Sequence, residues 1–402
     1  MSHVKYIILG AGPSGLTLAN ILKERGENSF LVIEKEAVAG GLCRSVWVDG
    51  APFDIGGGHF LDIRRPIVTE FLFKFMPIDE WNLFNRDSQI SVNGSMVSHP
   101  LEANIWQFDE SIQKEYLESI KNAGCNTGSP MPDKFVDWIF WKLGDKISND
   151  YMIPYNQKMF ANELNELGTY WLEKLPNVSF EDTQKSCEEH KAYGQQPGHA
   201  SFYYPKKYGY GEVFLRMADN IKENIVYNAE ASELNISDKA VTFNSETVYA
   251  DNIIVTVPWN SFREIIGLPE HLLNGIKKLK SSAIETRYVN DTLDTNAQWI
   301  YYPDSSLPYH RILVRHNFCP NSRGYWYETR KERVPMFKED AAFSYINEYA
   351  YPLNTIEKPL IMDSLLKFLT PYHVYGLGRW GEHNHYNSDV VIEKAILLAE
   401  KI

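Results

Sequence analysis

Short apolar runs flank a helical stretch at the start of the chain. Residues 4–9 and 29–33 are almost wholly apolar, which is typical of buried parallel strands. Between them, Leu16, Ala19 and Leu22 recur at helical spacing. The pattern therefore predicts a strand–helix–strand unit with buried parallel strands.

Further along, the pattern changes from helical to strand-like. Residues 101–190 show helical periodicity, interrupted by loop-forming residues at 124–132. Residues 90–97 alternate around an Asn-Gly pair, which is a strong hairpin signal. Residues 283–330 contain further short apolar runs and favour an antiparallel sheet.

Composition limits the classes of protein to consider. Apolar residues make up 44% of the 402, enough for substantial cores, and no run approaches the ~18 apolar residues of a membrane span. The net charge of −12 argues against nucleic acid and anionic membranes as partners. We expect no metal site and no disulfide, because the four cysteines are scattered without a C-x-x-C pair. An N-terminus that begins directly with a strand predicts a cytoplasmic protein.

The first apolar run leads straight into a glycine turn of the G-x-G-x-x-G type at residues 10–15. Gly10 suits the tight turn, Gly12 lets backbone N–H groups approach a pyrophosphate, and Gly15 allows close helix–strand packing. The helix that follows directs its positive end at the phosphates. Glu34 ends the second apolar run, where an acid can accept both ribose hydroxyls. The unit predicts a dinucleotide site; the alternative is a glycine turn in an ordinary βαβ unit.

Three other segments favour FAD over NAD. A second glycine turn at 40–44 ends in Arg44, which can meet a phosphate. The small residues at 54–59 let the backbone lie against a flat ring. Near the C-terminus a Gly-Arg turn precedes a helix, with Ser388 or Asp389 as the expected N-cap. The residues predicted to bind the cofactor are Gly10, Gly12, Pro13, Ser14, Gly15, Glu34, Lys35, Gly41, Leu42, Arg44, Gly57, Gly58, Val226, Gly378, Arg379, Asp389 and Val390.

The fold prediction is α/β. A discontinuous Rossmann-like FAD-binding domain is expected to carry an inserted helical domain and an antiparallel β-sheet domain. The expected boundaries are 1–80, 195–265 and 355–402 for the FAD-binding domain, 101–190 for the helical insertion, and 85–100 and 266–354 for the substrate sheet.

With these motifs the chain resembles the flavoproteins that include amine oxidases, protoporphyrinogen oxidase and UDP-galactopyranose mutase. Several middle segments resemble the mutase family more than the oxidases, and they occur in the same order. These segments are residues 97–104, 152–160, 308–314, 348–352 and 378–382.

The resemblance implies a flavin-dependent mutase that interconverts the pyranose and furanose forms of a nucleotide sugar for cell-surface polysaccharides. N5 of the reduced flavin would attack the anomeric carbon and expel the nucleoside diphosphate, with no net redox change. An external reductant such as NAD(P)H would prime the flavin, and a homodimer is the candidate assembly. The resemblance assigns contacts with the substrate's diphosphate to Arg311, Lys174, Tyr155 and Tyr351. Two histidines are further candidates: His59, which follows the glycines at 56–58 and is expected over the reactive edge of the flavin, and His385, which could hydrogen-bond the substrate or the flavin.

Three positions depart from the family pattern. Lys174 stands where the family has the phosphate-gripping Arg of its mobile lid, and a Lys loses the bidentate fork. His385 stands at the position of a phosphate-binding Tyr, and Phe160 at that of a Trp. The substrate prediction therefore stays divided between UDP-galactose and another sugar nucleotide such as dTDP-fucose.

Plainer interpretations stay open beside these. A conventional FAD-dependent oxidoreductase of the amine oxidase type would rest on the flavin motifs alone, and a non-catalytic homologue would rest on the fold. Arg311 could pair with a surface carboxylate, and Lys174 could be a solvated helix-end residue. Tyr155, Tyr351, His59 and His385 could be ordinary core or rim residues.

Overall fold

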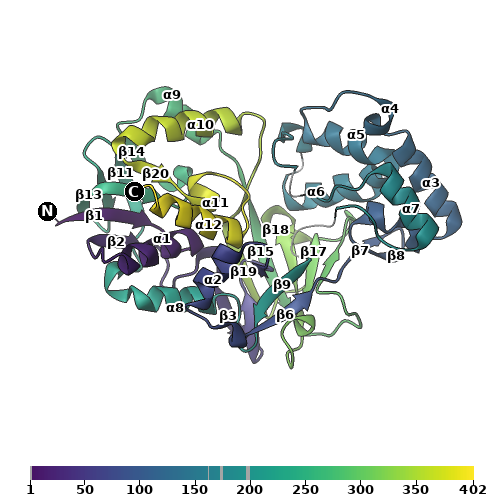
Figure 1. The fold of residues 1–402 in the computed structure, drawn as a ribbon, viewed down its shortest axis with the longest axis horizontal. Coiled ribbons are helices and arrows are strands. Elements are labelled where there is room, and N and C mark those ends of the chain that lie inside the picture. Colours follow the sequence, from purple (N-terminus) through teal and green to yellow (C-terminus); the bar gives the residue numbers. More distant parts are fainter. Residues whose placement is uncertain (1, 162, 173–174, 196–199) are drawn as a thin grey trace.

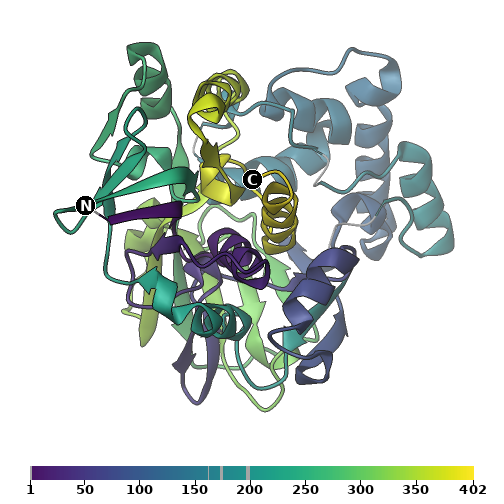
Figure 2. The ribbon, with the colours of Figure 1, turned by 60° about the vertical axis from the view of Figure 1, so that its left-hand side comes forward.

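A computed structural model describes residues 2–161, 163–172, 175–195 and 200–402. Lys174 lies outside the described residues. Two sheets and a helical unit make up most of the molecule, with the helical unit at the upper right of Figure 1 and the N-terminal sheet at the left. Both chain ends lie with the N-terminal sheet (Figures 1 and 2).

The first sheet contains the predicted strand–helix–strand unit. Its central strands run parallel in the order β10, β2, β1, β13, with β20 also parallel to β13, and β12 and β11 extend it antiparallel. β14 completes this edge. The strands are β1 (Ser2–Leu9), β2 (Phe30–Ile33), β10 (Ile225–Val226), β11 (Ala231–Asn235), β12 (Ala240–Phe243), β13 (Glu246–Val255), β14 (Glu264–Ile266) and β20 (Val374–Gly376).

Helices cover both faces of this sheet because side chains of β1 alternate between two cores. Tyr6 and Ile8 face the core with α1, α8 and α12, whereas Ile7 and Leu9 face the core with α9 and α10. α9 falls within the sequence range predicted for the substrate sheet, yet it packs here. The helices are α1 (Pro13–Glu24), α8 (Glu212–Asn220), α9 (Glu270–Lys277), α10 (Lys358–Leu369), α11 (Gly378–Gly381) and α12 (Ser388–Ala399).

The second sheet has seven strands in the order β19, β15, β18, β17, β16, β7, β8. It is antiparallel except where β7 runs parallel to β16. The predicted hairpin is β7–β8, and its Asn93 and Gly94 both have positive φ (52° and 75°), as a tight hairpin turn requires. The strands are β7 (Ser88–Val92), β8 (Ser95–Ser98), β15 (Ser281–Val289), β16 (Trp299–Tyr301), β17 (Arg311–Val314), β18 (Tyr325–Arg330) and β19 (Phe343–Pro352).

The helical unit is inserted between β8 and β9. Its longest helix, α5, approaches α3 closely at Gly144, where a side chain would overlap the Ser119 carbonyl. Its helices are α3 (Glu110–Lys121), α4 (Gly124–Thr127), α5 (Phe135–Ile147), a π-helical turn (Ser148–Met152), α6 (Ile153–Met159) and α7 (Phe180–Glu189).

Smaller elements join these parts. Residues 202–211, predicted to return to the FAD-binding domain, begin within a three-stranded sheet in which β9 lies between β5 and β6. No helix among the described residues is long and apolar enough to cross a membrane. The remaining elements are β3 (Ser45–Val48), β4 (Ala51–Asp54), β5 (Leu61–Asp62), α2 (Pro66–Phe73), β6 (Trp81–Asn85) and β9 (Ser201–Pro205).

Candidate active site

A cavity of about 440 Å³ lies where β1, β2 and β13 end. The glycine turn lines it through Gly10, Gly12, Pro13 and Ser14, so the N-terminus of α1 points into the cavity. A Cβ on Gly12 would find only the Cα of Gly41 nearby, 3.9 Å away. The free space in front of Gly12 is therefore available for a ligand that touches backbone.

Glu34 marks one end of this cavity. Its carboxylate accepts hydrogen bonds from the backbone N–H groups of Ala11 (2.7 Å) and Glu36 (2.9 Å). Burial raises the pKa of Glu34, while these two hydrogen bonds act in the opposite direction. The carboxylate is thus held in place beside the turn, as a ribose-binding acid must be.

Arg44 spans the cavity wall instead of pointing freely inward. It pairs with Glu36 (Nη1–Oε2, 3.2 Å) and donates to the Tyr345 hydroxyl (2.8 Å) of β19. Arg44 therefore joins the loop after β2 to β19 of the second sheet.

Ten of the predicted cofactor residues line this cavity: Gly10, Gly12, Pro13, Ser14, Glu34, Lys35, Gly41, Leu42, Arg44 and Arg379. Gly58 lines the adjoining cavity. The wall of neither cavity includes Gly15, Val226, Gly57, Gly378, Asp389 or Val390.

For three of these six residues, other contacts give the reason. Gly15 packs against the Gly10 carbonyl, and Val226 accepts the Glu34 backbone N–H (2.9 Å). Asp389 is paired with Arg65 (2.7 Å).

The predicted N-cap of α12 was wrong by one or two positions. Asn387 is the N-cap, and Ser388 is the first helical residue. Ser388 and Val391, one turn apart, face the large cavity in place of Asp389 and Val390. The rotational phase of α12 decides which of its residues face the cavity. The periodicity of the sequence does not define that phase to within one residue.

A second cavity of about 160 Å³ continues from the first. The two share Leu42, His59, Arg379 and Ser388. Three arginines line the second cavity, Arg86, Arg311 and Arg379. Its apolar walls are Phe60, Ile284, Trp299 and Ala350.

Arg311 begins β17 and is paired with Glu328 of β18. Nε of Arg311 lies 3.0 Å from Oε2 of Glu328, and Nη2 contacts the same oxygen. Burial alone would raise the pKa of Glu328, but Arg311 and the neighbouring His310 outweigh it and lower that pKa to about 2. Glu328 is therefore an anion, and it neutralises part of the charge of Arg311.

Arg379 is held differently, since its side chain donates to backbone carbonyls. These belong to Tyr386 (2.7 and 2.9 Å) and Ala350 (3.1 Å). Burial lowers the pKa of Arg379, although an arginine stays charged. Carbonyl dipoles orient this cation without cancelling its charge, so it can attract an anion at the junction of the cavities.

Tyr351 and His385 lie together in the second cavity, with ring centroids 4.6 Å apart. The Tyr351 hydroxyl is 3.5 Å from Nη2 of Arg311. Phe160 packs against both rings, at 6.1 Å from Tyr351 and 5.9 Å from His385. Tyr155 does not line the cavity, but contacts Tyr301 of its wall (5.4 Å).

His59 lines both cavities, and its Nδ1 lies 3.2 Å from the Gly57 carbonyl. Burial, and secondarily Arg379, lower the pKa of His59 to about 3. Burial also lowers the pKa of His310 to about 4. Both imidazoles are therefore neutral at physiological pH.

Four of the residues predicted to contact substrate or flavin lie together in the second cavity, and other residues of this site were not predicted. Arg311, Tyr351, His59 and His385 do meet in the second cavity. The residues that it missed are Arg86, Trp299, Tyr301, Glu328 and Asn387. Glu328, which directly follows the aromatic residues 325–327, was an available signal, because a buried charge needs a partner.

No metal-binding cluster of three or more His, Cys, Asp or Glu is present in the part of the chain that the structure describes. All four cysteines are free.

Comparisons with known proteins agree with this architecture. Residues 8–75 match the NAD(P)-binding Rossmann-like domain family. Over 357 residues the chain is 22% identical to L-amino acid oxidase Lm29 of Lachesis muta, covering 75% of this chain and 63% of the oxidase. Over 53 residues it is 47% identical to an uncharacterised protein from the nifH2 3′ region of Methanothermococcus thermolithotrophicus, covering 13% of this chain and half of that protein. The chain thus spans one half to less than two thirds of these curated relatives.

Solved structures define the class of fold. A putative protoporphyrinogen oxidase from Exiguobacterium sp. 255-15 matches all of this chain with a TM-score of 0.71, 13% identity and 99% of its own chain covered. A redesigned putrescine oxidase matches all of it with a TM-score of 0.67, 14% identity and 99% covered. The chain has the α/β fold of the amine oxidase-like flavoproteins, as predicted.

Within this class, the fold matches that of reduced UDP-galactopyranose mutase. The TM-score is 0.88 at 23% identity, over 99% of this chain and 93% of the mutase. The similarity establishes the fold, and confirms the resemblance predicted from the sequence.

Proposed function

We propose that this protein is an FAD-dependent mutase that interconverts the pyranose and furanose forms of a nucleotide sugar. The observation that carries the proposal is the cationic second cavity, which shares part of its wall with the large cavity. Arg311 and Arg379 line the second cavity; Glu328 balances the charge of the first, whereas backbone carbonyls hold the second. The charge of Arg379 suits a diphosphate.

The residues of the large cavity fit FAD. Gly12 leaves room for backbone contact with a pyrophosphate at the N-terminus of α1, and Glu34 is placed for the ribose. His59 and Arg379 stand where the two cavities meet, so a flavin reaching that point would border the second cavity. Reduced FAD would supply the nucleophile that displaces the nucleoside diphosphate from the anomeric carbon.

The chain's own residues would orient the sugar nucleotide and stabilise the departing charge. Arg311 and Arg379 oppose the negative charge that develops on the diphosphate, and the Tyr351 hydroxyl is positioned to donate beside Arg311. Phe60 and Trp299 exclude water from the reacting carbon. His59 is neutral and so adds no charge next to the cofactor. Lys174, as the lid cation, is part of the same proposal.

UDP-galactose is the proposed substrate, and dTDP-fucose is the competitor. The motivating observation is that His385, in place of a Tyr, packs on Tyr351 at the cationic wall. We further propose cytoplasmic synthesis of a precursor for cell-surface polysaccharide, with NAD(P)H as the reductant.

The decisive experiment is product analysis with dithionite-reduced holoprotein and either UDP-galactofuranose or dTDP-fucofuranose. We expect conversion of one of them to its pyranose form, and the faster reaction identifies the substrate. The same protein kept oxidised is the matched control and should convert neither. If the reduced protein with bound flavin converts neither compound, the proposal fails.

An FAD-dependent oxidoreductase is the second candidate, favoured by the match to an L-amino acid oxidase. Stopped-flow absorbance separates the two functions. An oxidase flavin is reduced by its organic substrate at every turnover, whereas a mutase needs a reductant only once.

A further inference from the structure

A row of polar side chains crosses the second sheet. Arg311 of β17 is the cross-strand neighbour of Glu328 on β18, and Glu328 is the neighbour of Thr286 on β15. Thr286 in turn is the neighbour of Tyr345 on β19. Directly opposed residues point to the same face of a sheet, so the four side chains form one continuous row.

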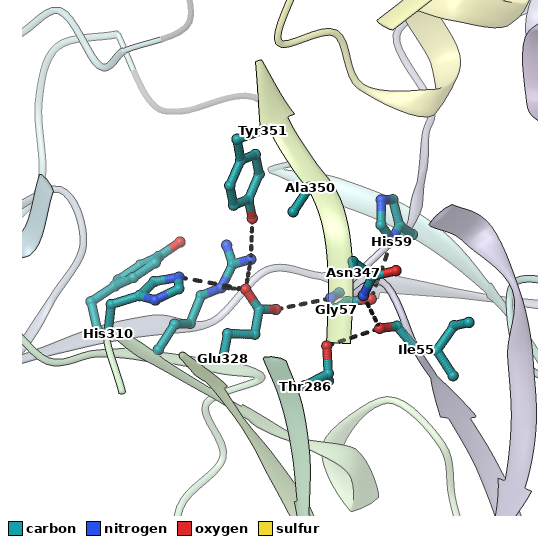
Figure 3. Close-up of polar contacts among 12 residues, drawn as sticks. Ile55, Gly57, His59, Thr286, His310, Glu328, Asn347, Ala350 and Tyr351 are labelled. Carbon is teal, nitrogen blue, oxygen red and sulfur yellow. Dashed lines mark hydrogen bonds and ion pairs between the residues drawn. The ribbon is translucent and has the colours of Figure 1, made fainter. Parts of the chain in front are cut away.

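The row lies against the chain segment 55–59, which carries His59. Thr286 Oγ1 and Asn347 Nδ2 both donate to the Ile55 carbonyl (2.9 and 2.6 Å), as Figure 3 shows. The Gly58 N–H donates to Oε1 of Glu328 (3.1 Å). Three neighbouring strands therefore hold the segment that separates the two cavities.

Glu328 is the member of the row that joins two parts of the second cavity's wall. Oε2 binds Arg311, and Oε1 binds Gly58. Its side chain is 1% exposed, so water cannot replace either bond. Gly57 has a φ of 87° and sits so close to this carboxylate that any Cβ would overlap it. The glycine at this position thus has a packing reason of its own.

We propose that Glu328 is a positioning residue that fixes the Arg311 guanidinium and the Gly57–His59 turn as one rigid unit. The inference rests on the proposed function, because it takes the anion at Arg311 to be a nucleoside diphosphate. Glu328 touches neither cofactor nor substrate in this arrangement; it acts through Arg311 on one side and Gly58 on the other.

The sign of the Glu328→Gln effect tests this role. If Glu328 were merely a nearby negative charge, removing it would strengthen the binding of an anion. As a positioning residue it does the opposite. Glutamine has one acceptor oxygen, and its NH₂ group would face either the Arg311 guanidinium or the Gly58 N–H, both of them donors. One of the two bonds must then be lost.

The measurement is UDP and inorganic pyrophosphate binding to the holoprotein by calorimetry. We expect Glu328→Gln to weaken UDP binding by about tenfold or more, the equivalent of one lost buried hydrogen bond to a charged group. In an Arg311→Ala background, Glu328→Gln should cause no further weakening. Binding by Glu328→Gln as tight as wild type, or tighter, overturns the proposal.

Glu285→Gln is the matched control. Glu285 is a buried carboxylate of the same sheet, paired with Arg287 (3.1 Å) and outside both cavities. It should leave UDP affinity and the flavin spectrum unchanged. If Glu328→Gln does not fold, Glu328→Asp keeps the charge but is too short to reach both partners. Full UDP affinity in Glu328→Asp then also contradicts the proposal.

The flavin absorbance separates this inference from the proposed function. Wild-type holoprotein that binds neither UDP nor pyrophosphate would refute the proposed function. The wavelength of the flavin absorbance maximum then tests the role of Glu328 independently of nucleotide binding. We expect Glu328→Gln to shift this maximum, because the turn that Glu328 holds ends in His59, which lines the large cavity. An unshifted band in that variant overturns the positioning role.

Discussion

Gly12 and Gly15 belong to one turn but are required for different reasons. In front of Gly12 there is empty cavity, whereas a side chain on Gly15 would overlap the Gly10 carbonyl. One glycine thus leaves room for a ligand, and the other lets the helix approach the strand.

Substituting these two glycines should separate cofactor binding from stability. Gly12→Val should abolish FAD binding and leave the apoprotein folded, since φ at Gly12 is −82° and its Cβ has space. Gly15→Ala should lower the free energy of unfolding by about 1–3 kcal/mol, because its methyl group overlaps the Gly10 carbonyl. This cost exceeds the ~1 kcal/mol by which alanine favours a helix over glycine. Flavin content and urea unfolding of both variants measure this. A fully yellow Gly12→Val protein would mean that the cofactor lies elsewhere.

Arg311 is the residue whose removal should affect activity most. Arg311→Ala should retain FAD and reduce the rate by about two to three powers of ten, typical of losing a main charge-stabilising donor. Arg311→Lys should recover only part of it, because a lysine cannot bind Glu328 and a phosphate as a fork. Steady-state kinetics with reduced enzyme is the measurement. A wild-type rate in Arg311→Ala would exclude this residue from the site.

At the scale of elements, a buried lysine joins the helical unit to the second sheet. Lys158 of α6 is 1% exposed and donates to the carbonyls of Tyr302 (2.8 Å) and Asp304 (2.7 Å). These carbonyls belong to the loop between β16 and β17, directly before Arg311. Lys158 therefore stabilises the loop that leads into Arg311.

Lys158 also makes the stability of this junction depend on pH. Burial lowers its pKa to about 7 from 10.5, so between these values the unfolded chain binds a proton that the folded chain does not. Its contribution to stability accordingly rises as pH increases from 7 to 10.5. Lys158→Met should be more destabilising at pH 9 than at pH 6, by urea unfolding. Lys121→Met, an exposed position of the same unit, should show no such difference. An equal loss at both pH values would contradict the shifted titration.

At the scale of the whole molecule, Asp54 connects three separate parts. Its buried carboxylate accepts from Ser45 of β3, from the Tyr204 hydroxyl of β9 (2.9 Å) and from the Tyr210 backbone (3.2 Å). Burial raises the pKa of Asp54 to about 7, against hydrogen bonds that lower it. The folded protein thus binds a proton here that the unfolded chain has lost above about pH 4.

This proton should appear in the stability of the whole protein. The stabilisation by Asp54 is full below pH 3.8 and is lost as pH rises through about 7. Asp54→Asn should therefore flatten the decline in unfolding free energy between pH 4.5 and 7.5. Part of the decline should persist, because burial raises the pKa of Glu102 to about 7 as well. A variant with the full wild-type slope would show that Asp54 ionises normally.

What the sequence determined by itself is local in origin. Strand, glycine turn, helix and acid lie within the first 34 residues, and the Asn-Gly hairpin lies within residues 88–98, so short-range sterics and hydrogen bonding specify them. Arg311, Tyr351 and His385 could be assigned to one site only through resemblance to a family, because their separation along the chain says nothing about their contact.

Tertiary structure decided the rest. The pairing of β17, β18, β15 and β19 placed Arg311 opposite Glu328 and brought Thr286 against Ile55, and the phase of α12 turned Ser388 inward instead of Asp389. Strand register and helix phase depend on the packing of whole elements, and a shift of one residue would reverse which side chains face the cavities. For that reason the glycine turn of residues 10–15 could be predicted from the sequence, while the buried carboxylate of Glu328 that joins Gly58 to Arg311 could not.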